Sequence, residues 1–213
     1  MKKIFDSHMN CIRSVLQEIS ARYQYKKRLL DIGCGDGTRT VIFDSFQRGL
    51  TGIDRMDWLS GSVREKLDFR KEDFMEGKLS MKDGSFDMAI SIDVIEHLRD
   101  PAPMLTEVHR VLQEGGIFII STPNRNRLFG FFLQLFGVRK FPYYPNKDTA
   151  ESDPYSAHVV EYTFSELKTL VKENGFKVIR GHKIFYGVTS GYGLTTFFSA
   201  PLFHNIVLEC KKL

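Results

Sequence analysis

The sequence predicts an α/β fold with a doubly wound, mainly parallel seven-stranded sheet between two helical layers, an α/β/α sandwich. Helical segments separate most of the predicted strands, which favours parallel pairing with right-handed crossovers. No helical segment separates the last two strands, so we expect them to form an antiparallel pair at one edge. Short apolar runs typical of strands occupy residues 28–32, 50–54, 67–73, 85–92, 115–122, 176–187 and 205–212.

Apolar residues at helical spacing predict an amphipathic helix over residues 4–24. A second helix is expected to begin near Thr38, directly after a glycine-rich loop. A third begins at Asp100, a good N-cap with Pro101 after it, and ends at Gly115. A fourth begins at the capping box formed by Thr163 and Glu166 and ends at Gly175.

The chain of 213 residues suits one domain, with 42% hydrophobic and 26% charged residues. We expect one domain over residues 1–213, with an N-terminal helix in 1–26 and an insertion in 123–162 after the fifth strand. The net charge of +4 is too small by itself to indicate a nucleic-acid partner.

The sequence favours a cytoplasmic protein. No apolar run follows the lysines near the N-terminus, so no signal peptide is predicted. The most apolar stretch, residues 128–138, is too short to span a bilayer. Cys11, Cys34 and Cys210 are odd in number and widely separated, which favours reduced thiols.

The strongest local motif is LLDIGCGDGTRT, residues 29–40, where a predicted strand runs through a glycine loop into a helix. Glycines allow a sharp turn and a close approach to a ligand. The motif lacks the GxGxxG pattern and the GK[ST] ending of phosphate-binding loops. An acidic residue precedes the first glycine and suits a cationic ligand group. The predicted binding residues of this loop are Asp31, Gly33, Cys34, Gly35 and Gly37.

More candidate binding residues follow the next strands, at the carboxyl ends where open α/β sheets bind ligands. Asp54, beside Arg55, ends the second strand, and its carboxylate suits the two hydroxyls of a ribose. Asp73 follows the third strand and suits an exocyclic amine, with Phe74 against an adenine ring. Ser91 lies near the end of the fourth strand.

This ordered series resembles the class I S-adenosylmethionine-dependent methyltransferases, which have a Rossmann-like fold. DIGCGDG resembles their first motif, FDMAISIDVIEHL their fourth and VLQEGGIFIISTPN their fifth-strand segment. By resemblance, Asp54 is the ribose-binding acid and Asp73 the adenine-binding acid. The resemblance implies S-adenosylmethionine as the cofactor and a methyl transfer as the reaction.

Polar residues after the fourth strand and in the insertion are expected at the methyl acceptor. An oxygen acceptor needs a base or a metal ion to remove its proton. His97 and His158 are the candidate catalytic bases. Two carboxylates and two imidazoles can also bind one Mg²⁺, Mn²⁺ or Zn²⁺ ion, and the candidate ligands are Asp93, Glu96, His97 and His158.

The segments DVIEHLRDP, STPNRNRL and AHVVEYTFSEL resemble the ubiquinone-biosynthesis O-methyltransferases. The resemblance implies that Asp93, Glu96, His97 and His158 are metal ligands or acceptor-site residues. Asp93 departs from the glutamate that is commoner at its position, which shortens the reach to a metal. In many related enzymes a Glu-His pair at this place only shapes the pocket. Metal binding, acid-base catalysis and pocket shaping therefore stay open.

Basic and aromatic residues alternate in residues 125–147, and no acidic residue occurs between 115 and 147. Such a segment suits a lid over an apolar acceptor, a peripheral contact with a membrane interface, or a helix packed on the protein's own core.

We expect a methyltransferase whose acceptor is a small aromatic or lipid-like molecule, methylated on oxygen. The alternatives are an RNA ribose 2′-O-methyltransferase, which RNA binding would reveal, and a non-catalytic cofactor-binding or membrane-associated module. A Rossmann dehydrogenase is a further alternative, against which the absence of GxGxxG counts. A nucleic-acid partner is not expected, and the sequence does not indicate an oligomeric state.

Overall fold

The computed structural model describes residues 8–46, 48–126, 158–184 and 203–213. In these residues seven strands form one sheet with the order β3-β2-β1-β4-β5-β7-β6. The first five are mutually parallel, whereas β7 runs antiparallel to both of its neighbours. The strands are β1 (Arg28–Ile32), β2 (Gly49–Asp54), β3 (Asp68–Lys71), β4 (Phe86–Ile92), β5 (Leu112–Pro123), β6 (Phe176–Ile184) and β7 (Asn205–Lys212). The predicted mainly parallel sheet with an antiparallel last pair is confirmed.

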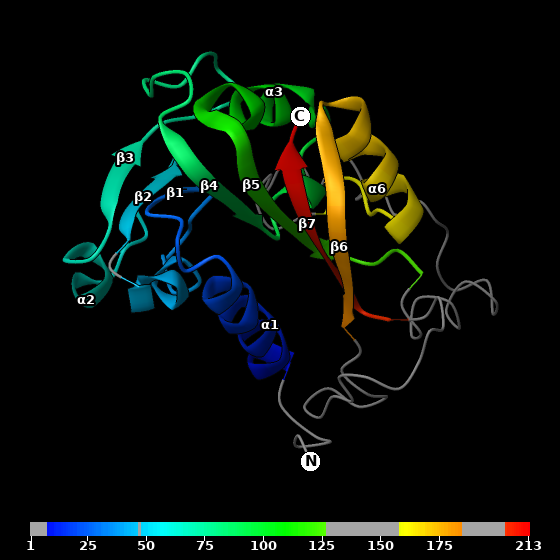
Figure 1. The fold of residues 1–213 in the computed structure, drawn as a ribbon, viewed down its shortest axis with the longest axis horizontal. Coiled ribbons are helices and arrows are strands. Elements are labelled where there is room, and N and C mark those ends of the chain that lie inside the picture. Colours follow the sequence, from blue (N-terminus) through cyan, green and yellow to red (C-terminus); the bar gives the residue numbers. More distant parts are fainter. Residues whose placement is uncertain (1–7, 47, 127–157, 185–202) are drawn as a thin grey trace, which may run out of the picture.

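Helices cover both faces of the sheet (Figure 1). The helix α1 (His8–Arg22) and the 3-10 helix η1 (Thr40–Phe46) pack on one face. The helices α3 (Ala102–Val111) and α6 (Phe164–Glu173) pack on the other. Two short elements, α2 (Gly61–Arg64) and η2 (Ile95–His97), follow β2 and β4. The sheet has an apolar core on each face because successive strand residues point to opposite faces.

Most predicted helix boundaries are met, with two corrections. The capping box of Thr163 and Glu166 is present at the start of α6. The element after the glycine loop is a 3-10 helix and begins at Thr40, two residues after the predicted start. The third helix ends at Val111, and β5 begins directly after it and continues through Gly115. Gly115 has a φ of 69°, so it bends the start of a strand and does not end a helix.

Asp100 caps the N-terminal end of α3 as expected. Its Oδ1 accepts a hydrogen bond from the backbone N–H of Ala102 at 3.0 Å, although the N-cap position itself is Pro101. The three cysteines are buried and free, which agrees with the prediction of reduced thiols. Within the described residues no helix is long and apolar enough to cross a membrane.

Candidate active site

The glycine loop turns directly after β1 and is tied to the end of β2. The backbone N–H of Gly33 and of Cys34 both donate to the carbonyl oxygen of Ile53, at 2.9 and 3.0 Å. The N–H of Gly35 donates to Asp54 Oδ2 at 3.0 Å. The first, second and third glycines have φ values of 75°, 54° and 74°, in the left-handed region that only glycine adopts at little cost. The loop therefore needs its glycines for the turn itself.

Space is also restricted at Gly33. A Cβ atom at this position would lie 2.6 Å from Val94 Cγ2, closer than two carbon atoms approach. Gly35 differs, because no atom lies within 4 Å of the position of its missing Cβ. The loop therefore rests on Val94 at its first glycine and is open at its second.

Asp31 is a buried carboxyl group behind this loop. Its Oδ2 accepts a hydrogen bond from the hydroxyl of Thr40 at 2.5 Å, and its Oδ1 has no hydrogen-bond partner within the described residues. Burial raises the pKa of Asp31 to about 7, although the Thr40 hydroxyl and the charge of Arg39 act in the opposite direction. A buried carboxyl oxygen without a donor suits a cationic group of a ligand.

The contribution of Asp31 to the stability of the protein is expected to fall as pH rises from about 4 to about 7. The pKa of Asp31 is raised from 3.8 to about 7, so the folded state holds a proton that the unfolded chain releases in this interval. The stability that this proton contributes is present below pH 4 and is lost as pH rises through 7, a change on the order of 4 kcal/mol.

Urea unfolding at stepped pH measures this effect, and the Asp31→Asn variant is the control. Asparagine cannot titrate, so the variant should lack the part of the change in unfolding free energy between pH 4 and 7 that Asp31 contributes. The slope that remains includes Glu96, whose pKa is also raised. Equal slopes in the two proteins would show that Asp31 is not held protonated by the fold.

A cavity of about 530 Å³ opens at the carboxyl ends of β1, β2 and β4. Its wall is formed by Gly33, Asp54, Arg55, Met56, Trp58, Glu72, Asp73, Phe74, Met75, Asp93, Val94, His97, Leu98, Arg99 and Val159. This volume is in the range of small-molecule sites. Among the predicted cofactor residues, the structure brings five into this wall: Gly33, Asp54, Arg55, Asp73 and Phe74.

The two acidic residues of the cavity are held by the backbone. Asp54 accepts from the N–H of Gly35 and, through Oδ1, from the N–H of Met56 at 3.1 Å. Asp73 accepts from the N–H of Met75 at 2.8 Å, and its Oδ2 lies 3.7 Å from a guanidinium nitrogen of Arg55. These contacts fix the directions of both carboxylates before a ligand arrives.

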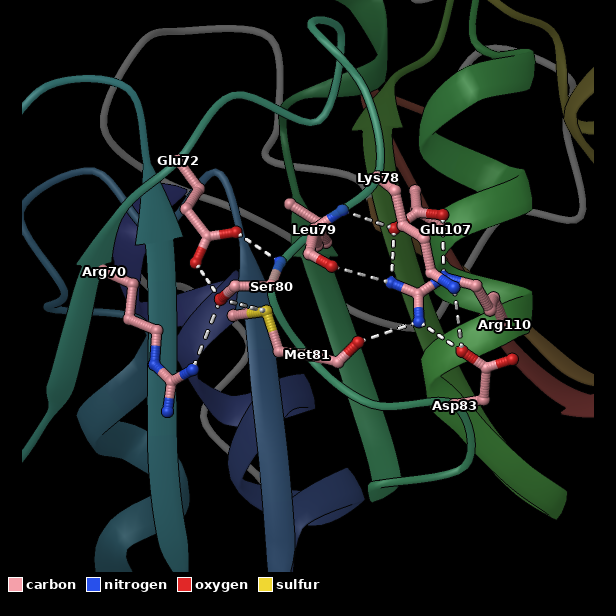
Figure 2. Close-up of polar contacts among 9 residues, drawn as sticks. All are labelled: Arg70, Glu72, Lys78, Leu79, Ser80, Met81, Asp83, Glu107 and Arg110. Atoms are coloured by element: carbon pink, nitrogen blue, oxygen red, sulfur yellow. Dashed lines mark hydrogen bonds and ion pairs between the residues drawn. The ribbon is translucent and has the colours of Figure 1, made fainter.

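The segment after Asp73 is fastened to α3 by two charged residues (Figure 2). Arg110 donates to the carbonyl oxygens of Met81 at 2.8 Å and Leu79 at 3.2 Å. Glu107 accepts from the N–H of Leu79 at 2.8 Å and pairs with Arg110 at 2.6 Å. Nearer the cavity, Glu72 accepts from both the N–H and the hydroxyl of Ser80, as Figure 2 also shows. This side of the cavity is therefore built on α3.

Two predicted cofactor residues are placed differently. Ser91 is completely buried and its hydroxyl lies 3.6 Å from Met104 Sδ in α3, because strand alternation turns it away from the loop face. Ser91 is therefore not among the residues of the cavity wall, and its contact with a cofactor stays a prediction. Cys34 contributes its backbone to the loop, and its sulfur packs 2.9 Å from the position of a Cβ on Gly52. Burial raises the pKa of the Cys34 thiol, which excludes a thiolate at neutral pH.

Glu96, His97 and His158 come together, and His97 is the member of this group that lines the cavity. One ligand atom from each lies within 4.8 Å of the others. The rings of His97 and His158 meet edge to face, with centroids 5.2 Å apart. The backbone of residues 159 and 160 reaches this place by donating two hydrogen bonds to the carbonyl oxygen of Glu96, at 2.7 and 3.1 Å. The predicted proximity of these three residues, 62 positions apart at most, is present in the structure.

Two of these side chains have buried partners. Glu96 is 1% exposed, and its Oε2 accepts from the hydroxyl of Thr122 at 3.0 Å. Burial, and then the charge of Asp93, raise the pKa of Glu96 to about 8. His158 Nδ1 shares a hydrogen bond of 3.1 Å with Glu161 Oε1, and Glu161 is also 1% exposed. This contact leaves Nε2 of His158 as the nitrogen available to a substrate or a metal ion.

Asp93 does not join the group of Glu96, His97 and His158. Its carboxylate accepts from Arg39 at 2.6 Å, from the hydroxyl of Ser121 at 2.7 Å and from the amide of Asn205 at 3.3 Å. Its φ of 56° is in the left-handed region, which is unusual for a residue other than glycine. Three donors from distant parts of the chain therefore hold its carboxylate, and its role as a metal ligand stays a prediction.

Four residues of the site have no place in the sequence prediction: Arg39, Thr122, Glu161 and Arg99. Arg39 follows the glycine loop by two positions and Glu161 follows His158 by three. No sequence motif identifies residues at these spacings as part of a site. The predicted lid or membrane segment lies mostly in residues 127–157, outside the described residues. At its N-terminal side, Arg125 pairs with Glu166 of α6.

Comparison with known proteins agrees with this arrangement. Residues 5–180 match the model of a methyltransferase domain. The chain is 30% identical over 162 residues to a probable S-adenosylmethionine-dependent methyltransferase of Mycolicibacterium smegmatis, covering 75% of this chain and 55% of that protein. It is 32% identical over 109 residues to the ubiquinone biosynthesis O-methyltransferase of Pseudomonas aeruginosa, covering 47% and 46%. The chain spans about half the length of the curated relatives it matches.

Solved structures share the fold at lower identity. A possible histamine N-methyltransferase from Thermotoga maritima has a TM-score of 0.67 and 18% identity, covering 96% of this chain and 90% of that one. A 1,6-didemethyltoxoflavin-N1-methyltransferase from Burkholderia thailandensis, with bound S-adenosylhomocysteine, has a TM-score of 0.64 and 17% identity, covering 94% and 77%. With the fold, the glycine loop and the matched region in agreement, the chain belongs to the methyltransferase domain family.

Proposed function

We propose that the protein uses S-adenosylmethionine to methylate a small acceptor on oxygen. The observation that carries this proposal is the shared cavity, whose wall contains Gly33, Asp54 and Asp73 together with His97. When bound, S-adenosylmethionine supplies an activated methyl group on a sulfonium. Because the methyl group is already activated, the protein mainly has to position the acceptor and remove its proton.

The residues at the glycine-loop end fit the cofactor. The carboxylate of Asp54 is held by two backbone donors and suits the ribose hydroxyls. Asp73 and Phe74 stand together in the wall and suit the amine and the ring of adenine. Asp31 offers a buried oxygen without a hydrogen-bond donor in the described residues, which suits the ammonium group of the methionine part.

His97 and His158 support a role in proton removal. A neutral imidazole beside the acceptor can take the proton of a hydroxyl group. His158 is oriented by Glu161, and His97 lines the cavity beside the ring of His158. Either imidazole is a candidate base, and the fixed Nδ1 contact favours His158.

A divalent metal ion is the alternative way to activate the hydroxyl. Glu96, His97 and His158 provide one carboxylate and two imidazoles, a donor set that suits Mn²⁺ or Zn²⁺ and, less well, Mg²⁺. A bound ion would lower the pKa of a coordinated hydroxyl group. Thr122 and Glu161 would then orient the ligands from behind.

The proposed function is tested by calorimetric titration with S-adenosylhomocysteine, followed by transfer of radiolabelled methyl from S-adenosylmethionine to a panel of phenols, catechols and their lipid-tailed forms. We expect micromolar binding and methylation of at least one phenolic oxygen. Binding without transfer to any acceptor would favour a non-catalytic module. No binding to the folded protein would contradict the cofactor assignment.

Removal of metal distinguishes the two modes of activation. If Glu96, His97 and His158 hold an ion, we expect Mn²⁺ to bind at one site per chain, as measured by its electron paramagnetic resonance signal. Glu96→Gln should lower the affinity for Mn²⁺ about 10- to 100-fold. Dialysis against EDTA should then abolish methylation without changing the affinity for S-adenosylhomocysteine. An Asp93→Asn control should keep the Mn²⁺ site, because Asp93 is directed to Arg39. Full activity in EDTA would contradict a metal role.

A further inference from the structure

Arg99 is a cation in the wall of the cavity without a carboxylate partner. Its side chain is exposed, follows η2 by two residues and lines the cavity beside Leu98. In the part of the chain that the structure describes, Arg99 makes no ion pair and no hydrogen bond through its side chain. The nearest acid in the sequence, Asp100, is occupied as the cap of α3. An unpaired guanidinium in a binding cavity suits a negatively charged ligand group.

The carboxylates that share the cavity with Arg99 are all engaged elsewhere. Asp93 pairs with Arg39 at 2.6 Å, and Asp73 lies 3.7 Å from Arg55. Glu72 accepts from Ser80, and Asp54 accepts from two backbone N–H groups. Among the described residues of the wall, each of these acids therefore has a partner in the fold, whereas the guanidinium of Arg99 is left for a ligand or for water.

Arg99 is not among the wall residues that the proposed function assigns to the cofactor. Gly33, Asp54, Asp73 and Phe74 form the part of the wall assigned to the cofactor. The residues of the wall that follow β4 or precede α6 are left for the acceptor: Asp93, Val94, His97, Leu98, Arg99 and Val159. Three of these are apolar, one is an imidazole, one is a guanidinium, and one is the carboxylate of Asp93, which is paired with Arg39. This composition fits an acceptor with an apolar body, a hydroxyl group and an anionic group.

We propose that Arg99 determines acceptor specificity by binding a carboxylate or another anionic group on an apolar, hydroxylated acceptor. This inference rests on the proposed function, because the proposed function assigns Gly33, Asp54, Asp73 and Phe74 of the wall to the cofactor. An anion on the acceptor forms charge-assisted hydrogen bonds with the planar guanidinium. A neutral acceptor of the same shape would leave the guanidinium of Arg99 hydrated, so Arg99 would not raise the affinity for that acceptor.

The test compares two probes of the same shape, 4-hydroxybenzoate and 4-hydroxybenzamide. Each is titrated into the full chain saturated with S-adenosylhomocysteine, in the presence of EDTA so that metal chelation plays no part. We expect the acid to bind about tenfold more tightly than the amide, as one charged hydrogen-bonded contact at an exposed side chain provides. Arg99→Gln should remove this preference, and Arg99→Lys should keep part of it.

The controls separate this inference from the proposed function. Arg13→Gln changes an exposed arginine of α1 outside the cavity wall and should keep the full preference. Equal binding of the two probes by the native protein, or no binding of the acid when S-adenosylhomocysteine still binds, would overturn the role of Arg99. A loss of affinity for S-adenosylhomocysteine in Arg99→Gln would overturn it too, since Arg99 would then contact the cofactor. A native chain that does not bind S-adenosylhomocysteine would overturn the proposed function itself.

Discussion

Replacement of Gly33 by valine is expected to lower the affinity for S-adenosylhomocysteine by at least about 100-fold. Gly33 has a φ of 75°, which costs other residues roughly 1–2 kcal/mol. A Cβ at this position would also lie 2.6 Å from Val94 Cγ2, so the loop or Val94 must move. Because each 1.4 kcal/mol is tenfold in affinity, strain and collision together reach this size. Calorimetric titration measures it.

Two further variants make the Gly33 test specific. Gly33→Ala combined with Val94→Ala removes the colliding methyl groups and leaves only the backbone strain, so it should recover part of the affinity. Gly61→Ala adds a methyl group where no atom lies within 4 Å, and it should bind normally. Thermal unfolding of each variant shows whether the fold is retained. Normal affinity in a folded Gly33→Val protein would mean that the cofactor does not contact this loop.

Replacement of His158 by alanine is expected to lower kcat about 10²- to 10⁴-fold, the usual contribution of a general acid-base group. The variant should keep its affinity for S-adenosylhomocysteine within about twofold, since His158 stands with Glu96 and His97 and is not among the residues assigned to the cofactor. The measurement is the initial rate of methyl transfer to the acceptor found in the panel, with both substrates saturating.

Val159→Ala is the matched control for His158→Ala. Val159 is the next residue and lines the cavity, but it has no polar side chain. Its truncation should raise the KM for the acceptor with little effect on kcat. A similar loss of kcat in both variants would indicate that His158 only shapes the pocket. Full activity of His158→Ala would leave His97 as the remaining candidate base.

The positions of the strands and of the glycine loop could be predicted because their signals are local. Apolar runs and glycines lie within about ten residues of one another, and φ above zero at Gly33 and Gly37 is a property of the residues themselves. The capping box of Thr163 and Glu166 is local for the same reason. Helix ends were less certain, because Leu112 continues from α3 straight into β5 when it pairs with Phe86.

Side-chain directions depended on contacts between distant segments. Ser91 follows the alternation of β4, and a shift by one residue decides whether it faces α3 or the loop. Asp93 lies three residues before Glu96, but Arg39, Ser121 and Asn205 compete for its carboxylate. A pattern of residue types does not show which of several possible donors is nearest.

The amino-acid sequence alone therefore establishes the mainly parallel sheet, the glycine loop after its first strand and the acids that follow the next two strands, because backbone preferences and hydrophobic periodicity act over short distances. The tertiary structure decides which side chains meet: His158 with Glu96 and His97, Asp93 with Arg39, and Arg99 with no carboxylate in the described residues. These pairings depend on the packing of segments far apart in the chain, where distance and burial determine each electrostatic contact.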